Sequence, residues 1–407
     1  MKNFLASLRK LIIVAVLLFS LPVFAQDAND LYDQAWNSYQ EEDYPKALNL
    51  VNKAIAKDKN RVAYYQVKAY IQIAMKAKPS EVIETANAGL KLDNDNADLT
   101  EMRGTSYYFD FKHDLALQDF RRMIELKNDD ARYFNNYFKL LNELRYDEEL
   151  MSKSKIFEDA VEDGVIDKTE RYVGDSYFYP ALAFGRDGNY KKAVELLDKA
   201  IDYAPDAEMY YNNRGLYYLE LKEDKKALAD LTKAIELDPE NEEYYVNRNI
   251  AFFRMNDHVS GRNDLLKALA LGSNDAGVYA DLAMSYLIDN DHKKAAEMYE
   301  AYFKKVNNNP TAFGNYAYTV LEFGEVDKAK TYFEKAQAIE PDEIDFYLGM
   351  MAVAKLKNDN TLLEKMKSEF PGKFNKYKLS AKLLDQLEKE GYSYTDSFKK
   401  KWKEIFK

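Results

Sequence analysis

A segment of 34 residues that recurs along the chain most strongly constrains how this protein can fold. The sequence reads AVELLDKAIDYAP up to Pro205 and ALADLTKAIELDP up to Pro239, one period later. The related AKTYFEKAQAIEP ends at Pro341, three further periods along. Self-similarity at this period indicates one small structural unit copied in series, in which each copy buries its apolar face only against its neighbours.

The prolines define five gapless repeats, which begin near residues 174, 208, 242, 276 and 310. Each repeat contains two apolar patterns of helical period, separated by a short polar turn. Small residues recur at positions 8, 20 and 27, which predicts close contact between two successive helices. At position 15 the repeats carry residue types that accept the left-handed backbone of a helix end, namely Gly188, Asn256, Asn290 and Gly324.

This pattern resembles the tetratricopeptide-repeat family, which has a small residue at position 8, alanine at positions 20 and 27 and proline at position 32. The same register gives four less regular copies within residues 28–164 and a degenerate tenth copy at 343–370. The predicted fold is therefore all-α, with about ten antiparallel helix-pair repeats of 34 residues and C-terminal capping helices. The resemblance implies a right-handed superhelical solenoid whose concave groove is lined by the first helix of each repeat.

The sequence predicts five segments. Residues 1–25 have Lys2, Arg9 and Lys10 around the start of a short apolar run that ends at Ala25, as in a cleaved signal peptide; an uncleaved anchor is the alternative. About four repeats follow in residues 26–164, then an irregular linker at 165–173 that is either a hinge or a longer loop. About six repeats fill residues 174–370, and 371–407 form the capping helices.

Composition narrows the possible functions. The chain has no cysteine, so it has no disulfide, no thiolate metal site and no lipid-attachment cysteine. Together with the expected signal peptide, this predicts an exported protein, periplasmic or secreted, that is not a lipoprotein and has no membrane-spanning segment once processed. A net charge of −11 argues against nucleic acid as a partner. His113, His258 and His292 all fall at position 17, in the turn, which predicts neither a metal site nor a catalytic centre.

The groove positions implied by the resemblance give the candidate binding residues. Position 6 carries Asn213, Asn247, Asp281 and Asn315, whose polar side chains could pair with the backbone of an extended peptide. Positions 9 and 12 of the same block are apolar and include Leu216, Ile250, Phe253, Met284 and Tyr318. In the N-terminal half the same positions carry the aromatic residues Trp36, Tyr39, Tyr70 and Tyr108.

These residues predict a non-enzymatic scaffold without a cofactor, which binds a peptide or protein segment in its groove, within a cell-envelope assembly. The partner and the oligomeric state are not specified by the sequence. The alternative is a module that recognises glycan through the N-terminal aromatic residues. Those rings could instead pack between successive helices, and asparagine at position 6 could be frequent without any ligand.

Three local patterns give further expectations. At positions 8 and 20 of one repeat stand Asn249 and Gly261, so a larger residue on one helix is offset by a smaller one on the other, unless the two changed independently. Arg214 and Arg248, at position 7, are expected to brace neighbouring helices. The last predicted helix has Phe398, Trp402, Ile405 and Phe406 on one face and lysines around the other, as in a cap or a membrane-surface helix.

Overall fold

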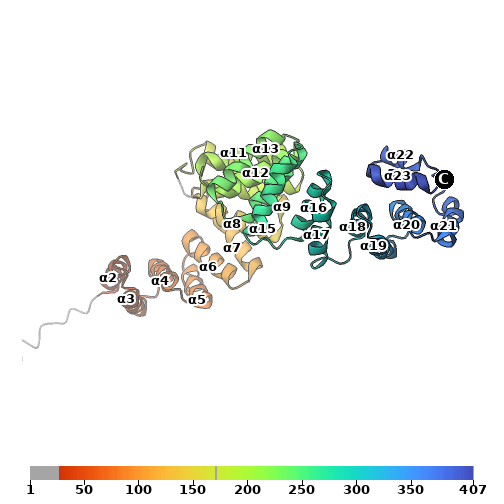
Figure 1. The fold of residues 1–407 in the computed structure, drawn as a ribbon. Helices are drawn as coiled ribbons and strands as arrows, with labels where there is room; N and C mark the ends of the chain where they lie inside the picture. The colour runs from red at the N-terminus through yellow and green to blue at the C-terminus, as the bar shows by residue number, and fades with distance from the viewer. Residues whose placement is uncertain (1–26, 170–171, 407) are drawn as a thin grey trace, which may run out of the picture. The chain divides into compact units, whose positions relative to one another are not determined.

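The computed structural model describes residues 27–169 and 172–406, which form helices and turns with no strand among them (Figure 1). The expected signal peptide, residues 1–25, lies outside the described residues. By its contacts the chain divides into two compact units, Met1–Pro205 and Asp206–Lys407. In neither unit is any described helix both long and apolar enough to cross a bilayer.

The described part of unit 1 consists of helix pairs, in each of which a short turn reverses the chain. These helices are α2 (Ala28–Gln40), α3 (Tyr44–Lys57), α4 (Val62–Ala74), α5 (Pro79–Leu90), α6 (Ala97–Phe109), α7 (His113–Leu126), α8 (Ala131–Leu144), α9 (Asp147–Glu162), α10 (Val173–Arg186) and α11 (Tyr190–Tyr203). The two helices of a pair pack on each other, and the next pair packs on them in turn.

Unit 2 continues the same arrangement and ends in two further helices. Its pairs are formed by α12 (Glu208–Glu220), α13 (Asp224–Leu237), α14 (Glu242–Arg254), α15 (His258–Ala270), α16 (Ala276–Ile288), α17 (His292–Phe303), α18 (Pro310–Glu322), α19 (Val326–Ile339), α20 (Ile344–Leu356) and α21 (Asn360–Lys373). The last two helices are α22 (Leu383–Glu388) and α23 (Asp396–Glu404). The prediction of an all-α repeat fold is confirmed.

One left-handed residue in the turn of each helix pair keeps the register. The predicted residues Gly188, Asn256, Asn290 and Gly324 have φ angles of 81°, 60°, 58° and 85°. Six further pairs place a non-glycine residue in this conformation, with φ between 52° and 62°: Glu42, Lys76, Phe111, Arg145, Lys222 and Asn358. A Cβ in this region costs about 1–2 kcal/mol, so packing of the two helices imposes the turn even where the residue disfavours it.

Small residues allow the close helix contacts, as predicted. Ala227 and Ala234 are fully buried, and a Cβ added to Gly215 would lie 2.8 Å from Cγ of Leu231. In the next repeat, a Cβ added to Gly261 would lie 2.6 Å from Oδ1 of Asn249. The two residues therefore face each other, as the size compensation between them requires.

Ion pairs of one fixed spacing also brace the helix pairs. An arginine on the first helix forms two hydrogen bonds to an aspartate 16 residues later, on the second helix. The aspartate side chains are almost buried. The pairs are Arg103–Asp119, Arg214–Asp230 and Arg248–Asp264. This confirms the structural role expected for Arg214 and Arg248.

The predicted linker, residues 165–173, lies inside unit 1. Ile166 and Val173 are fully buried, and the Ser176 hydroxyl donates to the Ala131 carbonyl at 3.3 Å. Helix α10 packs on both α8 and α9, so the helix pairs continue across the irregular segment. The boundary between the two units lies after Pro205, where α11 has ended.

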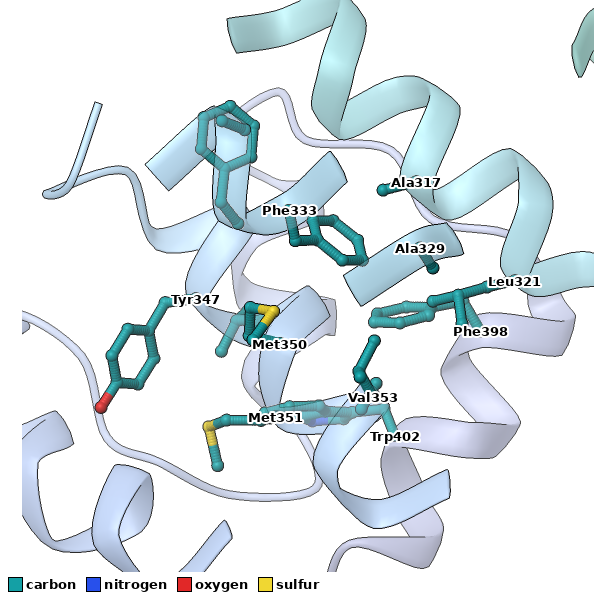
Figure 2. Close-up of a cluster of buried hydrophobic side chains, with 14 of the residues drawn as sticks. Ala317, Leu321, Ala329, Phe333, Tyr347, Met350, Met351, Val353, Phe398 and Trp402 are labelled. Carbon is teal, nitrogen blue, oxygen red and sulfur yellow. The ribbon is translucent and has the colours of Figure 1, made fainter. Parts of the chain in front are cut away.

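Helix α20 is enclosed on every side at the C-terminal end of unit 2. Every residue from Phe346 to Ala354 is buried, as expected of a helix that is apolar all round. The C-terminal helices supply part of this cover: Figure 2 shows Phe398 and Trp402 of α23 beside Leu321 and Val353. The segment after α21 thus folds back over the first helices α18 and α20.

Candidate binding groove

The predicted groove positions of unit 2 lie on the first helices α12, α14, α16 and α18. Among them the large apolar side chains of Phe253 and Met284 are 46% and 40% exposed, and the neighbouring Ile288 is 41% exposed. We call the surface around these three residues the apolar groove. Exposed apolar side chains gathered in one concave place mark an interaction surface more often than isolated ones do.

Three adjoining cavities follow the apolar groove. The first, of about 230 Å³, is lined by Ile250, Phe253 and Met284. The second, of about 360 Å³, shares Phe253 and Met284 with the first and reaches Asn315. The third, of about 340 Å³, shares Met284 and Asn315 and reaches Tyr318. The structure therefore brings together six predicted residues along these cavities: Ile250, Phe253, Asp281, Met284, Asn315 and Tyr318.

The remaining predicted residues of this block lie elsewhere on α12 and α14. Asn213, Leu216 and Asn247 line none of the three cavities. The Asn213 amide donates to the carbonyl oxygen of Met209 in its own helix at 2.8 Å, and the Asn247 amide donates to Oδ1 of Asn212 at 2.9 Å. Two of the amides predicted to pair with a peptide backbone are thus engaged within the chain, and a peptide would have to displace these bonds.

The N-terminal aromatic residues of unit 1 mostly contact other residues of the chain. The ring of Trp36 stacks on Tyr39, with centroids 5.4 Å apart. Burial raises the pKa of the Tyr70 hydroxyl to about 12. The Tyr108 hydroxyl donates to Glu143 at 2.8 Å, and the Lys139 ammonium lies 5.5 Å from its ring. Trp36, Tyr39 and Tyr108 thus have ring or hydrogen-bond partners within the chain.

Each histidine begins the second helix of its pair, next to the predicted turn. The rings of His113 and His258 lie against aromatic neighbours, Tyr108 at 5.8 Å and Phe253 at 5.0 Å. Within residues 27–169 and 172–406, no three histidine, aspartate or glutamate side chains are grouped so that they could hold a metal ion.

The C-terminal segment forms one wall of the third cavity. Tyr394, Thr395 and Phe398 line it opposite Tyr318 of α18 and Asp345 of α20. Sequence reasoning missed Asp345, which lies near the start of the degenerate tenth copy at 343–370, outside the repeats from which the groove residues were taken. It could not have found Tyr394, because only the backward fold of the C-terminal segment brings this residue to the cavity.

Two carboxyl groups of this cavity differ in their environment. Burial raises the pKa of Asp345 to about 6. Burial also acts to raise the pKa of Glu322, but hydrogen bonds from Ser397 and Thr395 and the charge of Lys401 outweigh it and lower the pKa. The ionised form of Glu322 is thus stabilised by its neighbours, whereas the ionised form of Asp345 is destabilised by burial.

Comparison with known proteins agrees with the repeat assignment. The family described as Tetratricopeptide repeat matches residues 209–241 and 310–343, which contain most of α12–α13 and all of α18–α19. The chain is 24% identical over 180 residues to DnaJ homolog subfamily C member 3 of Gallus gallus, covering 44% of this chain and 29% of that protein. It is 28% identical over 133 residues to DnaJ protein P58IPK homolog B of Oryza sativa subsp. japonica, covering 32% and 26%. The match thus spans less than a third of either relative.

Solved structures of similar fold include a MamA protein, with 23% identity and a TM-score of 0.39, covering 42% of this chain and 92% of that chain. YrrB, described as a TPR protein with an unusual peptide-binding site, has 18% identity and a TM-score of 0.43, covering 48% and 99%. With its helix pairs in register and two of them matched by the family's own sequence models, the chain contains tetratricopeptide repeats.

Proposed function

We propose that this protein is an exported, non-enzymatic scaffold that binds a segment of another protein along the apolar groove of unit 2. The observation that carries the proposal is the row of exposed Phe253, Met284 and Ile288 over three adjoining cavities. An extended or helical segment can bury these side chains while the first helices stay in place, because the groove is built from rigid elements.

The proposal also includes export and a role in the cell envelope. They rest on the basic and apolar pattern of residues 1–25. Fractionation of cells that express the full chain checks this part. The expected product lacks its first 25 residues and is found in the periplasmic fraction; full-length protein in the cytoplasm contradicts export.

Site-specific photo-crosslinking tests the groove. A benzophenone side chain placed at Met284 should capture a discrete partner in envelope extracts, and the added change Phe253→Asp should abolish the adduct. The matched control is Leu266, which is 43% exposed on the second helix α15 and lines none of the three cavities. Equal capture from positions 266 and 284 would contradict binding in the groove.

Glycan recognition by the N-terminal aromatic residues is the competing function. Trp36 is 36% exposed, and its ring already stacks on Tyr39. Retention of the mature protein on cell-wall glycan, with release by Trp36→Ala but not by Phe253→Asp, would favour the competing function over ours.

A further inference from the structure

The C-terminal segment closes the apolar groove at one end. The Phe398 ring meets the Tyr318 ring edge-on, with centroids 4.8 Å apart. The Lys401 ammonium donates to the carbonyl oxygen of Leu321 at 3.1 Å and lies 3.3 Å from Oε2 of Glu322. Phe398 and the fully buried Trp402 anchor α23 in the apolar core (Figure 2), so α23 forms a fixed wall at this end of the groove.

A cavity of about 340 Å³ is left between this wall and the first helices. Its apolar side is formed by Met284, Leu287 and Ile288 of α16, at the end of the apolar groove. Polar groups gather on its other side, where α18, α20 and the C-terminal segment meet. An occupant that fits both sides has an apolar stem and a polar head.

Asp345 carries a negative charge into this cavity without a cation to balance it. The Tyr318 hydroxyl donates to the backbone carbonyl of Asp345 at 2.6 Å and also lies 3.1 Å from Oδ1. The carboxylate forms no ion pair with any described lysine, arginine or histidine, whereas the nearby Glu322 is paired with Lys401. A half-buried carboxylate that has only phenol partners gains from a cationic ligand.

The Tyr394 hydroxyl is a second polar group on the cavity wall. Tyr394 is 9% exposed, and its hydroxyl lies beside Asp345 but makes no hydrogen bond of good geometry within the described chain. The side-chain amide of Asn315 also lines the cavity. A primary ammonium has three N–H donors, which matches three acceptors: the carboxylate, the phenol oxygen and the amide oxygen.

We infer that this cavity, which we call the ammonium pocket, binds a primary ammonium on an apolar stem. Asp345 balances the charge, Tyr394 and Asn315 accept the other N–H groups, and Met284 and Leu287 cover the stem. The inference deepens the proposed function and rests on it: the segment bound in the apolar groove ends at the pocket with a lysine side chain or with its own N-terminal amine.

Binding of n-hexylammonium chloride, measured by titration calorimetry on the full mature chain, tests the pocket itself. Wild-type protein should bind it, hexan-1-ol should bind roughly tenfold more weakly or not at all, and Asp345→Asn should weaken hexylammonium binding by roughly tenfold or more. Asp342→Asn is the matched control, since it removes the same charge from a side chain that is 93% exposed. Equal binding of the amine and the alcohol, or wild-type affinity in Asp345→Asn, would overturn the inference.

Two peptides identify the source of the ammonium. Ac-Gly-Leu-Lys-Leu-Gly-NH2 offers only a lysine amine, and Leu-Gly-Leu-Gly-NH2 offers only an N-terminal amine. Binding of either one that depends on Asp345 supports the pocket and names its ligand, while binding of both that ignores Asp345 overturns it. The hexylammonium result needs no partner protein, so the pocket and the groove tested by crosslinking at Met284 can fail separately.

Discussion

Replacing Asp345 by Asn should stabilise the protein at neutral pH. The carboxyl group is enclosed by α18, α20 and the C-terminal segment, and burial raises its pKa from 3.8 to about 6. In the unfolded chain an aspartate has a pKa of about 3.9. The folded state therefore holds the ionised form less favourably than water does, and asparagine supplies a neutral side chain of nearly the same shape.

The sign and size follow from the raised pKa. Between about pH 4 and pH 6 the folded state binds more protons at this site than the unfolded state, so stability falls as pH rises through this range. Above pH 7 the cost is complete, at about 2–3 kcal/mol. A negative charge in the first turn of α20 interacts favourably with the helix dipole, and its loss costs about 0.5 kcal/mol. The net gain in stability expected for Asp345→Asn is therefore about 2 kcal/mol.

Other ionisable groups face Asp345 from each element packed around it. Glu343 precedes α20 and raises the pKa further, whereas the hydroxyls of Tyr318 and Tyr394 lower it. Glu322 and His292 line the same cavity. Because these groups lie close to Asp345, the comparison must be made between variants at each pH and not between two pH values of one protein.

Thermal unfolding of wild type, Asp345→Asn and the control Asp342→Asn at pH 7.5 and pH 4.5 measures the effect. For a cooperative unit of about 200 residues, 2 kcal/mol corresponds to a rise in Tm of about 4–8 °C. We expect this rise in Asp345→Asn at pH 7.5 only, with little change in the control. A lower Tm at pH 7.5, or the same difference at both pH values, would refute the reasoning.

Three further changes test the repeat framework by the free energy of unfolding. Gly261→Ala should cost about 1 kcal/mol, because its Cβ would lie 2.6 Å from Oδ1 of Asn249, and adding Asn249→Ala should recover most of the loss. Asp264→Ala should cost about 3 kcal/mol by leaving Arg248 unpaired, more than Arg248→Met with Asp264→Leu. Lys222→Gly should stabilise by about 0.5–1 kcal/mol, since Lys222 has a φ of 61°. The free energies of unfolding are measured by urea titration, and a different order of stability among these variants would contradict the packing argument.

The helix pairs could be predicted because the residue types that determine each pair recur at fixed positions within one repeat. Small residues such as Gly215 and Ala227 mark the close contacts, and the structure places both between the two helices of one pair. The turn residues were predictable only where glycine or asparagine stands. Phe111 adopts the same left-handed conformation with a φ of 57°, which no local preference of phenylalanine could indicate.

The candidate site was only partly predictable, for a physical reason. Phe253 and Met284 could be placed from the register alone, because a groove position on a first helix depends on the contacts within one or two repeats. The side-chain amides of Asn213 and Asn247 form hydrogen bonds within the chain, and these bonds cannot be predicted from the position of a residue in its repeat. The wall formed by Tyr394 depends on a long-range return of the chain, for which the repeats offer no template.

The stability cost of Asp345 and the ammonium pocket belong to one thermodynamic cycle. A bound cation that compensates the carboxylate must lower its pKa, so binding must weaken as the carboxyl is protonated below about pH 6. Hexylammonium, a cation at both pH values, should therefore raise the Tm of wild type more at pH 7.5 than at pH 4.5. It should have little effect on Asp345→Asn at either pH. A carboxylate with a purely structural role would still give the pH-dependent gain on substitution by asparagine, but it would show no stabilisation by hexylammonium, and this difference separates the two roles.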